Sequence, residues 1–428
     1  MAKICKIYDV LIIGAGAAGL FLAANLRVKS VAVPEKNATP GKKILASGGG
    51  RCNVTNRRID TSNYLGDANF VTNILKNLDF KDVLKFFGEL KFNEQKQNQF
   101  FCESGAKDVL GVLLKRARQS GAQIFCGVCV KGARKILADE NGEILDASLA
   151  KEAKFDSKNL QDFKSEQTEL FEVLAENGDK FYARNLVVAS GGLSYKKLGA
   201  SGIGYEIAQS FGTSVTTPAP ALVGFTVQKD EFWFKNLSGV CFPAEISVAC
   251  ANKNAANRES NMPRKFAGDI LFTHKGISGP AVLNASLFWQ KGLIAINFCP
   301  NFNIETAQKS KKQLSTVLPL PRRFTLEFLR AAGLSDKPYG EYKADEAAKI
   351  SRLFAYEFAP AGTFGFERAE VTKGGVDTDA LDANCCHKDT RGLYFIGEVL
   401  NVTGMLGGYN LHFAFACAAN LAKRLNAE

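Results

Sequence analysis

DVLIIGAGAAGLFLAANLRVKSVAVPE, residues 9–35, is the stretch that predicts the fold of the chain. Residues 10–13 form a short apolar run, which is typical of a buried parallel strand. Gly14, Gly16 and Gly19 follow at G-x-G-x-x-G spacing, and apolar residues then recur at a helical period. These glycines allow a tight turn, close approach of backbone to a pyrophosphate, and close packing of the helix on the strand. The stretch therefore predicts the first unit of a dinucleotide-binding domain.

A carboxylate stands where a dinucleotide site requires one. Glu35 ends a second predicted strand, residues 31–35, and lies 21 residues after Gly14. A carboxylate at such a strand end accepts hydrogen bonds from an adenosine ribose, while the phosphates lie on the helix N-terminus. The alternative is a glycine-rich turn in an ordinary α/β unit. Strand, helix and acid together favour the dinucleotide site.

Length and composition indicate a globular protein of two or three domains. The 428 residues are 46% hydrophobic and 23% charged, and no run approaches the roughly 20 apolar residues of a membrane span. The first strand begins almost at the N-terminus, which leaves no room for a signal peptide. We therefore expect a cytoplasmic location and no membrane partner.

The net charge of +11 leaves two interpretations open. Lys and Arg are scattered along the chain, so a solvated basic exterior is favoured over a nucleic-acid surface. The eleven cysteines, without a secretory context, are expected to be reduced thiols. Cys126 and Cys129 have C-x-x-C spacing in a strand-like stretch, and the chain has only three histidines, so no metal site is expected.

Four further motifs carry a family resemblance. They are GKKILASGGGRCNVTN (41–56), FYARNLVVASGG (181–192), FTHKGISGP (272–280) and GLYFIGEVLNVTGMLGGYNLHFAFACAANLAKRL (392–425). In this order they resemble the bacterial HI-type insert-domain flavoproteins, a family of NAD(P)/FAD-dependent oxidoreductases. Its members include an aminoacetone oxidase and a bile-acid-pathway flavoprotein. The resemblance covers nearly the whole chain.

The resemblance, with the composition, implies an α/β fold. It has a discontinuous Rossmann-like FAD-binding domain with an inserted β-barrel plus helical domain. The first segment would be residues 1–193 and the second 358–428, with an inserted substrate domain at 194–357. Within the insert, short β-like runs predict a barrel-like part at 217–300, and helical periods predict a helical part at 304–357. A polar surface segment is expected between Ala138 and Glu169.

The cofactor implied by the resemblance is FAD. Glu398, an acid just after a predicted strand, would bind the ribityl chain. The N-terminus of the helix that follows would point at the flavin. The residues expected to bind FAD are Gly14, Gly16, Ala17, Ala18, Gly19, Glu35, Lys36, Lys43, Ser47, Gly49, Arg51, Cys52, Asn53, Gly191, Gly192, Gly397, Glu398, Gly407, Gly408, Tyr409 and Asn410.

Three side chains are candidates for the chemistry itself. His274, in a glycine-flanked loop of the insert, and His412, near a helix start, are candidate acids or bases. Each has the alternative of a lone structural histidine. Arg51, with Asn53, would contact flavin or substrate, or else hold its loop together. Cys52 lacks the second cysteine of a C-x-x-x-x-C redox pair, so packing is favoured over a thiol relay.

The predicted function is hydride transfer between FAD and a small organic substrate bound between the two domains. The alternatives are an NAD(P)H-dependent reductase of an unsaturated substrate and, less favoured, an FAD-containing RNA-modifying protein; a purely structural FAD is a further one. No second Rossmann unit is found, so NAD(P)H would dock only transiently, and an organic electron donor is preferred. The family commonly has D-V-D-G where residues 401–404 read NVTG, and often Gln at His412, so substrate specificity does not transfer.

Overall fold

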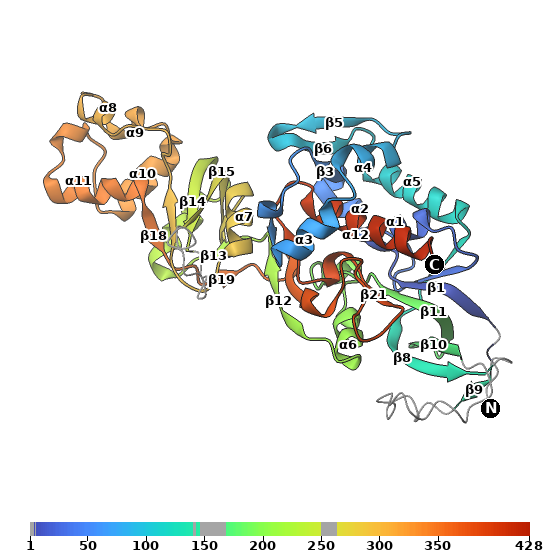
Figure 1. Cartoon of the computed structure of the whole chain (residues 1–428). Helices are drawn as coiled ribbons and strands as arrows, with labels where there is room; N and C mark the ends of the chain where they lie inside the picture. The colour runs from blue at the N-terminus through green and yellow to red at the C-terminus, as the bar shows by residue number, and fades with distance from the viewer. Residues whose placement is uncertain (1–3, 5, 140–142, 146–167, 250–262) are drawn as a thin grey trace. The chain divides into compact units, whose positions relative to one another are not determined.

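The computed structural model describes the chain except for residues 1–3, 5, 140–142, 146–167 and 250–262, and most of the surface segment expected between Ala138 and Glu169 lies outside the described residues. The chain forms two compact units (Figure 1). Unit 1 consists of Met1–Ala219 and Thr372–Glu428, and unit 2 of Pro220–Val371. Unit 1 is therefore discontinuous, with unit 2 inserted into it.

Unit 1 is built on an eight-stranded sheet with the order β7-β2-β1-β11-β10-β8-β9, and β21 pairs with β11. The strands that pair in parallel are β1 (Ile7–Ile13), β2 (Val31–Glu35), β7 (Ala122–Cys126), β11 (Lys180–Val188) and β21 (Leu393–Phe395). The antiparallel part consists of β10 (Thr168–Ala175), β8 (Val130–Ala138) and β9 (Ile144–Leu145). Residues 10–12 of β1 are completely buried, as expected of a central parallel strand.

Helices cover this sheet and close its core. α1 (Ala17–Asn25) packs against α5 (Ala106–Gln119) and α12 (Tyr409–Leu425) (Figure 1). The rings of Phe21 and Phe415 stack with centroids 4.8 Å apart, which fixes α1 on α12. The remaining helices of this unit are α2 (Lys42–Ala46), α3 (Ala68–Leu75), α4 (Phe80–Phe86) and α6 (Ile203–Ser210).

Three small antiparallel sheets complete unit 1. One pairs β3 (Asn53–Asn56), β6 (Gln99–Cys102) and β5 (Phe92–Gln95), and another pairs β4 (Tyr64–Leu65) with β22 (Thr403–Gly404). The third pairs β12 (Val215–Ala221) with β20 (Val371–Val376), where the chain leaves unit 1 and returns to it.

Unit 2 contains a seven-stranded antiparallel sheet with the order β18-β17-β14-β15-β16-β13-β19. Its strands are β13 (Phe225–Thr226), β14 (Cys241–Val248), β15 (Arg264–Thr273), β16 (Gly276–Ser278), β17 (Ile294–Asn297), β18 (Tyr356–Phe358) and β19 (Gly362–Thr363). Its helices are α7 (Pro280–Phe288), α8 (Glu305–Gln308), α9 (Leu314–Val317), α10 (Arg322–Ala331) and α11 (Ala344–Ser351). Buried rings of Phe242, Phe298 and Phe324 pack together in its core.

The structure confirms the α/β class and the discontinuous Rossmann-like domain. It differs from the predicted boundaries at 193/194 and 357/358, because α6 packs into the core of unit 1 and β18 and β19 belong to the sheet of unit 2. The barrel expected between residues 217 and 300 stays a prediction: the structure pairs these strands in one sheet, and among the described strands no pairing joins β18 to β19, the two ends of that sheet.

Candidate functional site

The turn between β1 and α1 is fixed by its glycines. A Cβ on Gly19 would lie 2.0 Å from the carbonyl oxygen of Gly14, and one on Gly14 would lie 2.7 Å from the oxygen of Ala189. A Cβ on Gly16, by contrast, would meet no atom within 4 Å. Two of the glycines are therefore required by protein packing, whereas the middle one faces open space. An open cradle at the start of α1 fits the pyrophosphate of a dinucleotide.

Ala17 and Ala18 begin α1, and the first turn has no acidic residue and no side-chain cap. Its N–H groups are therefore not occupied by a side chain of the protein, and the positive end of the helix favours an anion. Ala18 also packs against Gly397, where a Cβ would lie 2.9 Å from the Ala18 methyl carbon. This contact brings the C-terminal motif to the glycine turn.

Glu35 is buried at the end of β2, directly beside the glycine turn. Its Oε2 accepts a hydrogen bond from the Ala15 N–H at 2.8 Å. Its Oε1 accepts from the backbone N–H of Asn37 at 2.8 Å and from the Asn37 Nδ2 at 2.7 Å. The carboxylate is thus held at the strand end, with the lone-pair capacity to accept a ribose hydroxyl as well. Lys36, which follows it, is exposed.

The predicted signature loop begins with α2 and a tight glycine turn. Ser47 donates from Oγ to the carbonyl oxygen of Ile44 at 2.7 Å, and the Cys52 N–H returns to the Ser47 carbonyl at 3.1 Å. Gly49 lies between them at φ +65°, where a side chain would be strained, and it faces open space. The exposed guanidinium of Arg51 lies 4.6 Å from the centre of the Phe101 ring. The loop therefore presents backbone and one cation to its surroundings.

Buried amides tie this loop to the start of α12. Asn53 is best oriented with its Oδ1 accepting from the Gly408 N–H at 3.0 Å and its Nδ2 donating to the Thr55 carbonyl at 3.0 Å. Asn56 donates from Nδ2 to the carbonyl oxygen of Gly407 at 3.0 Å. A Cβ on Gly408 would lie 2.6 Å from the Thr55 carbonyl oxygen. The amide of Asn53 is therefore engaged in holding the helix start, and the sequence did not indicate Asn56 as its partner in that role.

Two further residues of the C-terminal motif also have internal partners. Asn410 exchanges hydrogen bonds with the backbone of Gly404, 2.8 Å in both directions. Tyr409 is buried, and its carbonyl oxygen accepts from the Tyr64 hydroxyl at 3.1 Å. Both side chains were expected to line the flavin, and the bonds shown here stabilise the loop that would do so.

His412 does not have the environment of an acid or base. It is completely buried, with Nε2 3.1 Å from the carbonyl oxygen of Leu78 and Nδ1 2.8 Å from Thr55 Oγ1. A carbonyl only accepts, so Nε2 carries the hydrogen and Nδ1 accepts from the hydroxyl. Burial lowers the pKa of His412 to about 4. Both ring nitrogens have partners within the protein, and the low pKa keeps the ring neutral, so this geometry favours the alternative of a structural histidine.

Cys52 is likewise part of the core. Its side chain is completely buried, its backbone is left-handed at φ +55°, and burial raises the pKa of its thiol to about 12. Arg57, at the position of the absent second cysteine, pairs with Glu94. The thiol is therefore protonated and enclosed, which favours packing over a redox role.

An acidic centre joins segments that are far apart in the sequence. Glu398 accepts from Lys43 Nζ at 2.5 Å through Oε2 and from the Thr372 N–H at 3.1 Å through Oε1. The Thr372 hydroxyl oxygen in turn accepts from the N–H groups of Leu193 and Ser194, at 2.8 and 3.0 Å. In the adjoining glycine pair, as in the first turn, one glycine is closely packed and another faces open space. A Cβ on Gly192 would lie 2.6 Å from Thr372 Oγ1, whereas one on Gly191 would meet no atom within 4 Å.

Two residues of this centre were missed from the sequence. Thr372 connects the glycine pair to Glu398, and Lys373, next to it, is half-buried, with burial lowering its pKa to about 8. The only sequence signal was their place in the segment that re-enters the first domain, RAEVTKGGV (368–376).

His274 lies in unit 2, at the exposed turn between β15 and β16. The turn is closed by bonds around Thr273, whose Oγ1 accepts from the Lys275 N–H and donates to the Gly276 carbonyl, each at 3.2 Å. An exposed imidazole is available to a ligand, so the acid–base expectation for His274 remains a prediction.

The described residues contain no group of three or more His, Cys, Asp and Glu side chains arranged to hold a metal ion. Nor does any helix in the described part of the chain have the length and apolar character needed to span a membrane.

The protein is an FAD-dependent oxidoreductase, and the open cradle, the buried acid and the two helix starts are the candidate site for its FAD. Comparison with known proteins identifies the family. Residues 8–153 and 147–424 match the profile described as the HI0933-like protein Rossmann domain. The chain belongs to this family, as the sequence motifs predicted.

Several relatives match nearly the whole chain. The chain is 35% identical to a ribosomal RNA dihydrouridine synthase of Haemophilus influenzae and 33% identical to one of Escherichia coli, over 97% of this chain and 98% of each relative. It is 29% identical to a 3-dehydro-bile acid delta(4,6)-reductase of Clostridium scindens, with the same coverage. Among solved structures, a 3-ketosteroid dehydrogenase of Rhodococcus jostii matches at 12% identity and a TM-score of 0.43, over 99% of this chain and 98% of that one.

Proposed function

We propose that the protein is an FAD-dependent reductase that converts uridine in ribosomal RNA to dihydrouridine. The observation that carries this proposal is the identity of 35% and 33% to two proteins of that name, over 97% of the chain. Both units are included in the match, so the similarity extends beyond the cofactor domain. The net charge of +11 suits a polyanionic substrate.

The named reactions of the relatives share one chemistry. Dihydrouridine forms when the C5–C6 double bond of uracil, which is conjugated to the C4 carbonyl, accepts a hydride at C6 and a proton at C5. A delta(4,6)-reductase also saturates carbon–carbon double bonds. Reduced FAD supplies the hydride in such reactions, and a nicotinamide or another two-electron donor then reduces the oxidised FAD again. We therefore infer that this chain saturates a double bond activated by a carbonyl group.

The residues of unit 1 bind and orient the cofactor for this reaction. The start of α1 and Glu35 would hold the phosphates and ribose, and Gly191 and Gly49 leave room for close backbone approach. The N-terminus of α12 would lie against the flavin, where its positive end stabilises negative charge on the ring. The Lys43–Glu398 pair would hold the ribityl side of the site.

Lys373 is the candidate donor of the proton that C5 receives. Lys373 has its pKa lowered to about 8 by burial, so its ammonium group can give up a proton near neutral pH more readily than an ordinary lysine. Arg51 and His274 remain candidates for contacting the substrate, as the sequence suggested. Of these, an arginine orients a carbonyl more readily than it donates a proton, because its pKa is too high.

The second candidate substrate is a small organic molecule, which is the substrate that the sequence analysis preferred. It is favoured by the relative that acts on a bile acid, which matches at 29% identity. That name also describes reduction, so both candidates require an electron donor such as NADPH and differ only in what is reduced.

The test is a nucleoside analysis of ribosomal RNA. Purified FAD-loaded protein is incubated anaerobically with NADPH and with ribosomal RNA transcribed in vitro, and the digested RNA is analysed by mass spectrometry. We expect dihydrouridine at one or a few positions, and none without the protein. Reduction of a 3-oxo-Δ4,6 steroid acid, with none of the RNA, would favour the small-molecule candidate and contradict the proposal.

A further inference from the structure

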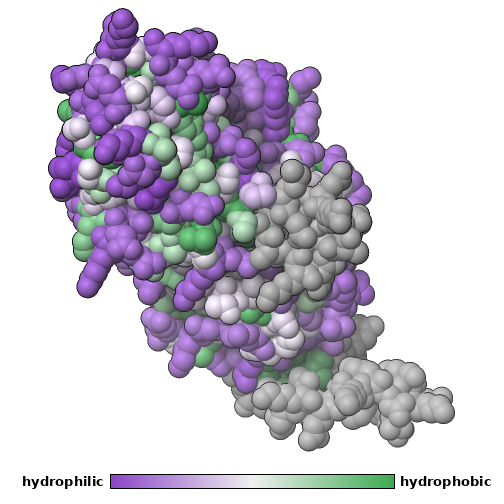
Figure 2. Space-filling view, turned by 90° about the vertical axis from the view of Figure 1, so that its left-hand side faces the viewer, coloured by the Kyte–Doolittle hydropathy of each residue, from purple (hydrophilic) through white to green (hydrophobic). Residues whose placement is uncertain are grey.

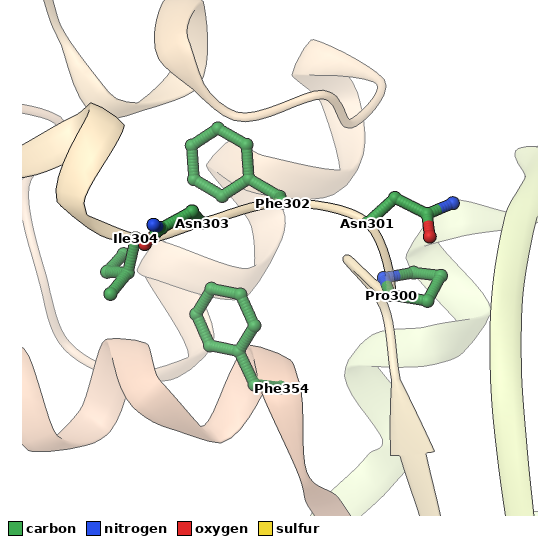
Figure 3. A pocket seen from close by; sticks show the side chains of 6 residues that line it. All are labelled: Pro300, Asn301, Phe302, Asn303, Ile304 and Phe354. Carbon is green, nitrogen blue, oxygen red and sulfur yellow. The ribbon is translucent and has the colours of Figure 1, made fainter.

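A hollow in unit 2 lies outside all the motifs discussed above. It has a volume of about 500 Å³, is open to solvent, and is lined by Pro300, Asn301, Phe302, Asn303, Ile304 and Phe354 (Figure 3). Five of these residues lie in the segment between β17 and α8, and Phe354 ends the short 3-10 turn η9 (Arg352–Phe354). The hollow is therefore formed within unit 2 alone.

Two aromatic rings on the walls of the hollow are partly exposed. Figure 3 shows the rings of Phe302 and Phe354 facing the hollow from opposite sides, and both side chains are only half-buried. Among the described residues, neither ring is in contact with another aromatic side chain. Nearby, Phe298 and Phe324 are buried with ring centroids 4.8 Å apart. The two open rings thus offer flat apolar surface to a ligand.

Polar groups beside the rings suit a nucleobase. Asn303 precedes α8, and its Oδ1 accepts from the Glu305 N–H at 3.0 Å, which fixes the orientation of its amide. Asn301 is exposed at the other end of the lining segment. An amide side chain both donates and accepts, as does the edge of uracil, and aromatic faces stack on any base. Figure 3 shows the Asn301 amide pointing away from the two rings, so the lining combines a stacking surface with the Asn303 amide, whose nitrogen can donate to a base edge.

A cluster of lysines adjoins the hollow. Lys309, Lys311 and Lys312 are exposed and follow α8, which places Lys309 roughly 8 Å along the helix from Ile304. The sequence has no acid between Lys309 and Arg323, and none of these three lysines is in a salt bridge of the described residues. Figure 2 shows a surface that is largely hydrophilic with small apolar areas between. Unpaired cations beside an apolar hollow favour a ligand with negative charge and a flat ring.

We propose that this hollow binds an unpaired nucleotide of an RNA strand. The base would lie against Phe302 and Phe354, and the adjoining phosphates would lie on Lys309, Lys311 and Lys312. The inference rests on the proposed function, since a dihydrouridine synthase must hold ribosomal RNA, and it assigns part of that task to unit 2. An apolar peptide would leave the lysine cluster without a partner, whereas an RNA strand uses both features.

The experiment measures binding of a short fluorescein-labelled oligouridine to the full-length, FAD-loaded protein by fluorescence anisotropy. We expect Phe302→Leu and Phe354→Leu each to weaken binding about tenfold, because leucine keeps the apolar volume but loses the stacking face. The matched control is Phe232→Leu, since this ring of unit 2 is 45% exposed and lies outside the hollow. Retained FAD and an unchanged thermal transition show that each variant is folded.

The lysines are tested by charge. Replacing Lys309, Lys311 and Lys312 together by glutamine should weaken binding and reduce the slope of log K against log salt by about 2. A control triple with the same loss of charge, Lys229, Lys291 and Lys343 to glutamine, should have a much smaller effect. Equal losses in the two triples would show non-specific attraction and overturn the inference.

The outcomes separate this inference from the proposed function. Ring-dependent binding without dihydrouridine formation would support the hollow and contradict the proposed reaction. Dihydrouridine formation by a protein whose ring variants bind as tightly as the wild type would contradict the hollow alone. Wild-type protein that binds no oligouridine would overturn the hollow, and the nucleoside analysis of ribosomal RNA would still decide the proposed reaction.

Discussion

The two helix starts of unit 1 are held in place by different means. The start of α1 is fixed by backbone packing, in which Gly19 lies so close to Gly14 that a Cβ would be 2.0 Å from its oxygen. The start of α12 is fixed by the buried side chains Asn53, Asn56 and His412, which come from other segments or from the helix itself. The glycine contact at α1 joins residues that are close in sequence, whereas the side-chain contacts at α12 join residues more than 300 positions apart. Both hold a helix N-terminus that we propose binds FAD.

The largest effect is expected from a change in the close glycine packing at the start of α1. Gly19→Ala places a methyl group against the Gly14 carbonyl, so the turn must open and the cradle for the pyrophosphate is lost. We expect FAD affinity to fall more than 100-fold, measured by flavin fluorescence on titration, with a stability loss of about 1–3 kcal/mol.

The control is Gly111→Ala in α5, where a Cβ meets no atom within 4 Å. There alanine is expected to stabilise the helix by up to about 1 kcal/mol and to leave FAD binding unchanged. If Gly19→Ala behaved like Gly111→Ala, the α1 start would not be fixed by glycine packing.

The next prediction tests the buried side-chain contacts at the start of α12 by the pH dependence of stability. The folded-state pKa of His412 is about 4, below its ordinary 6.5, so the unfolded chain binds the proton more tightly. Stability is therefore lost as the pH falls from about 6.5 towards 4, by up to about 3 kcal/mol for this group.

His412→Gln isolates this contribution. A glutamine amide can donate to the Leu78 carbonyl and accept from the Thr55 hydroxyl, but it has no proton to gain. Urea unfolding of the two proteins from about pH 7.5 down to about pH 4.5 should show nearly equal stability at the upper end and a more stable variant at the lower end. Parallel pH profiles would show that the imidazole is not held neutral.

These two predictions also show what the sequence could provide. The glycine spacing and Glu35 were predicted because each is defined within one β–α–β unit, and the structure places Glu35 2.8 Å from the Ala15 nitrogen. His412 resembled a reactive histidine because its partners, Thr55 and Leu78, are distant in sequence. Thr372 was missed for the same reason, since its contacts to Ser194 and Glu398 appear only in the folded chain.

The domain boundaries illustrate the same limit. The helical period of α6 is visible in the sequence, but which core it joins is decided by packing of Tyr205 and Ile207 in unit 1. The predicted barrel rested on many short strands, and the number of short strands does not determine whether a sheet closes.

A smaller effect is expected at the acid that supports the α1 turn. Glu35→Gln keeps the shape of the side chain but turns an NH2 group towards N–H donors and removes the charge that accepts the ribose hydroxyl. We expect FAD affinity to fall by about 1.5–3 kcal/mol, measured by equilibrium titration. Retention of full affinity would mean that the ribose is bound elsewhere.

The smallest effect is expected at Cys52, which directly precedes Asn53 in the chain. Its thiol is buried and burial raises its pKa to about 12, so we expect it to take no part in electron transfer. Cys52→Ser should leave the rate of flavin reduction within about twofold of the wild type, with some loss of stability from burying a hydroxyl. Loss of turnover with normal FAD content would indicate a thiol mechanism instead.

We propose that FAD, bound at these helix starts, reduces uridine in RNA. The most direct measurement is a single turnover: the enzyme-bound FAD is reduced, excess reductant is removed under anaerobic conditions, and ribosomal RNA is added while flavin absorbance is followed. We predict that the RNA reoxidises the flavin and that one dihydrouridine forms per FAD oxidised. Flavin that stays reduced with RNA, but is reoxidised by an unsaturated 3-oxo acid, would contradict the account.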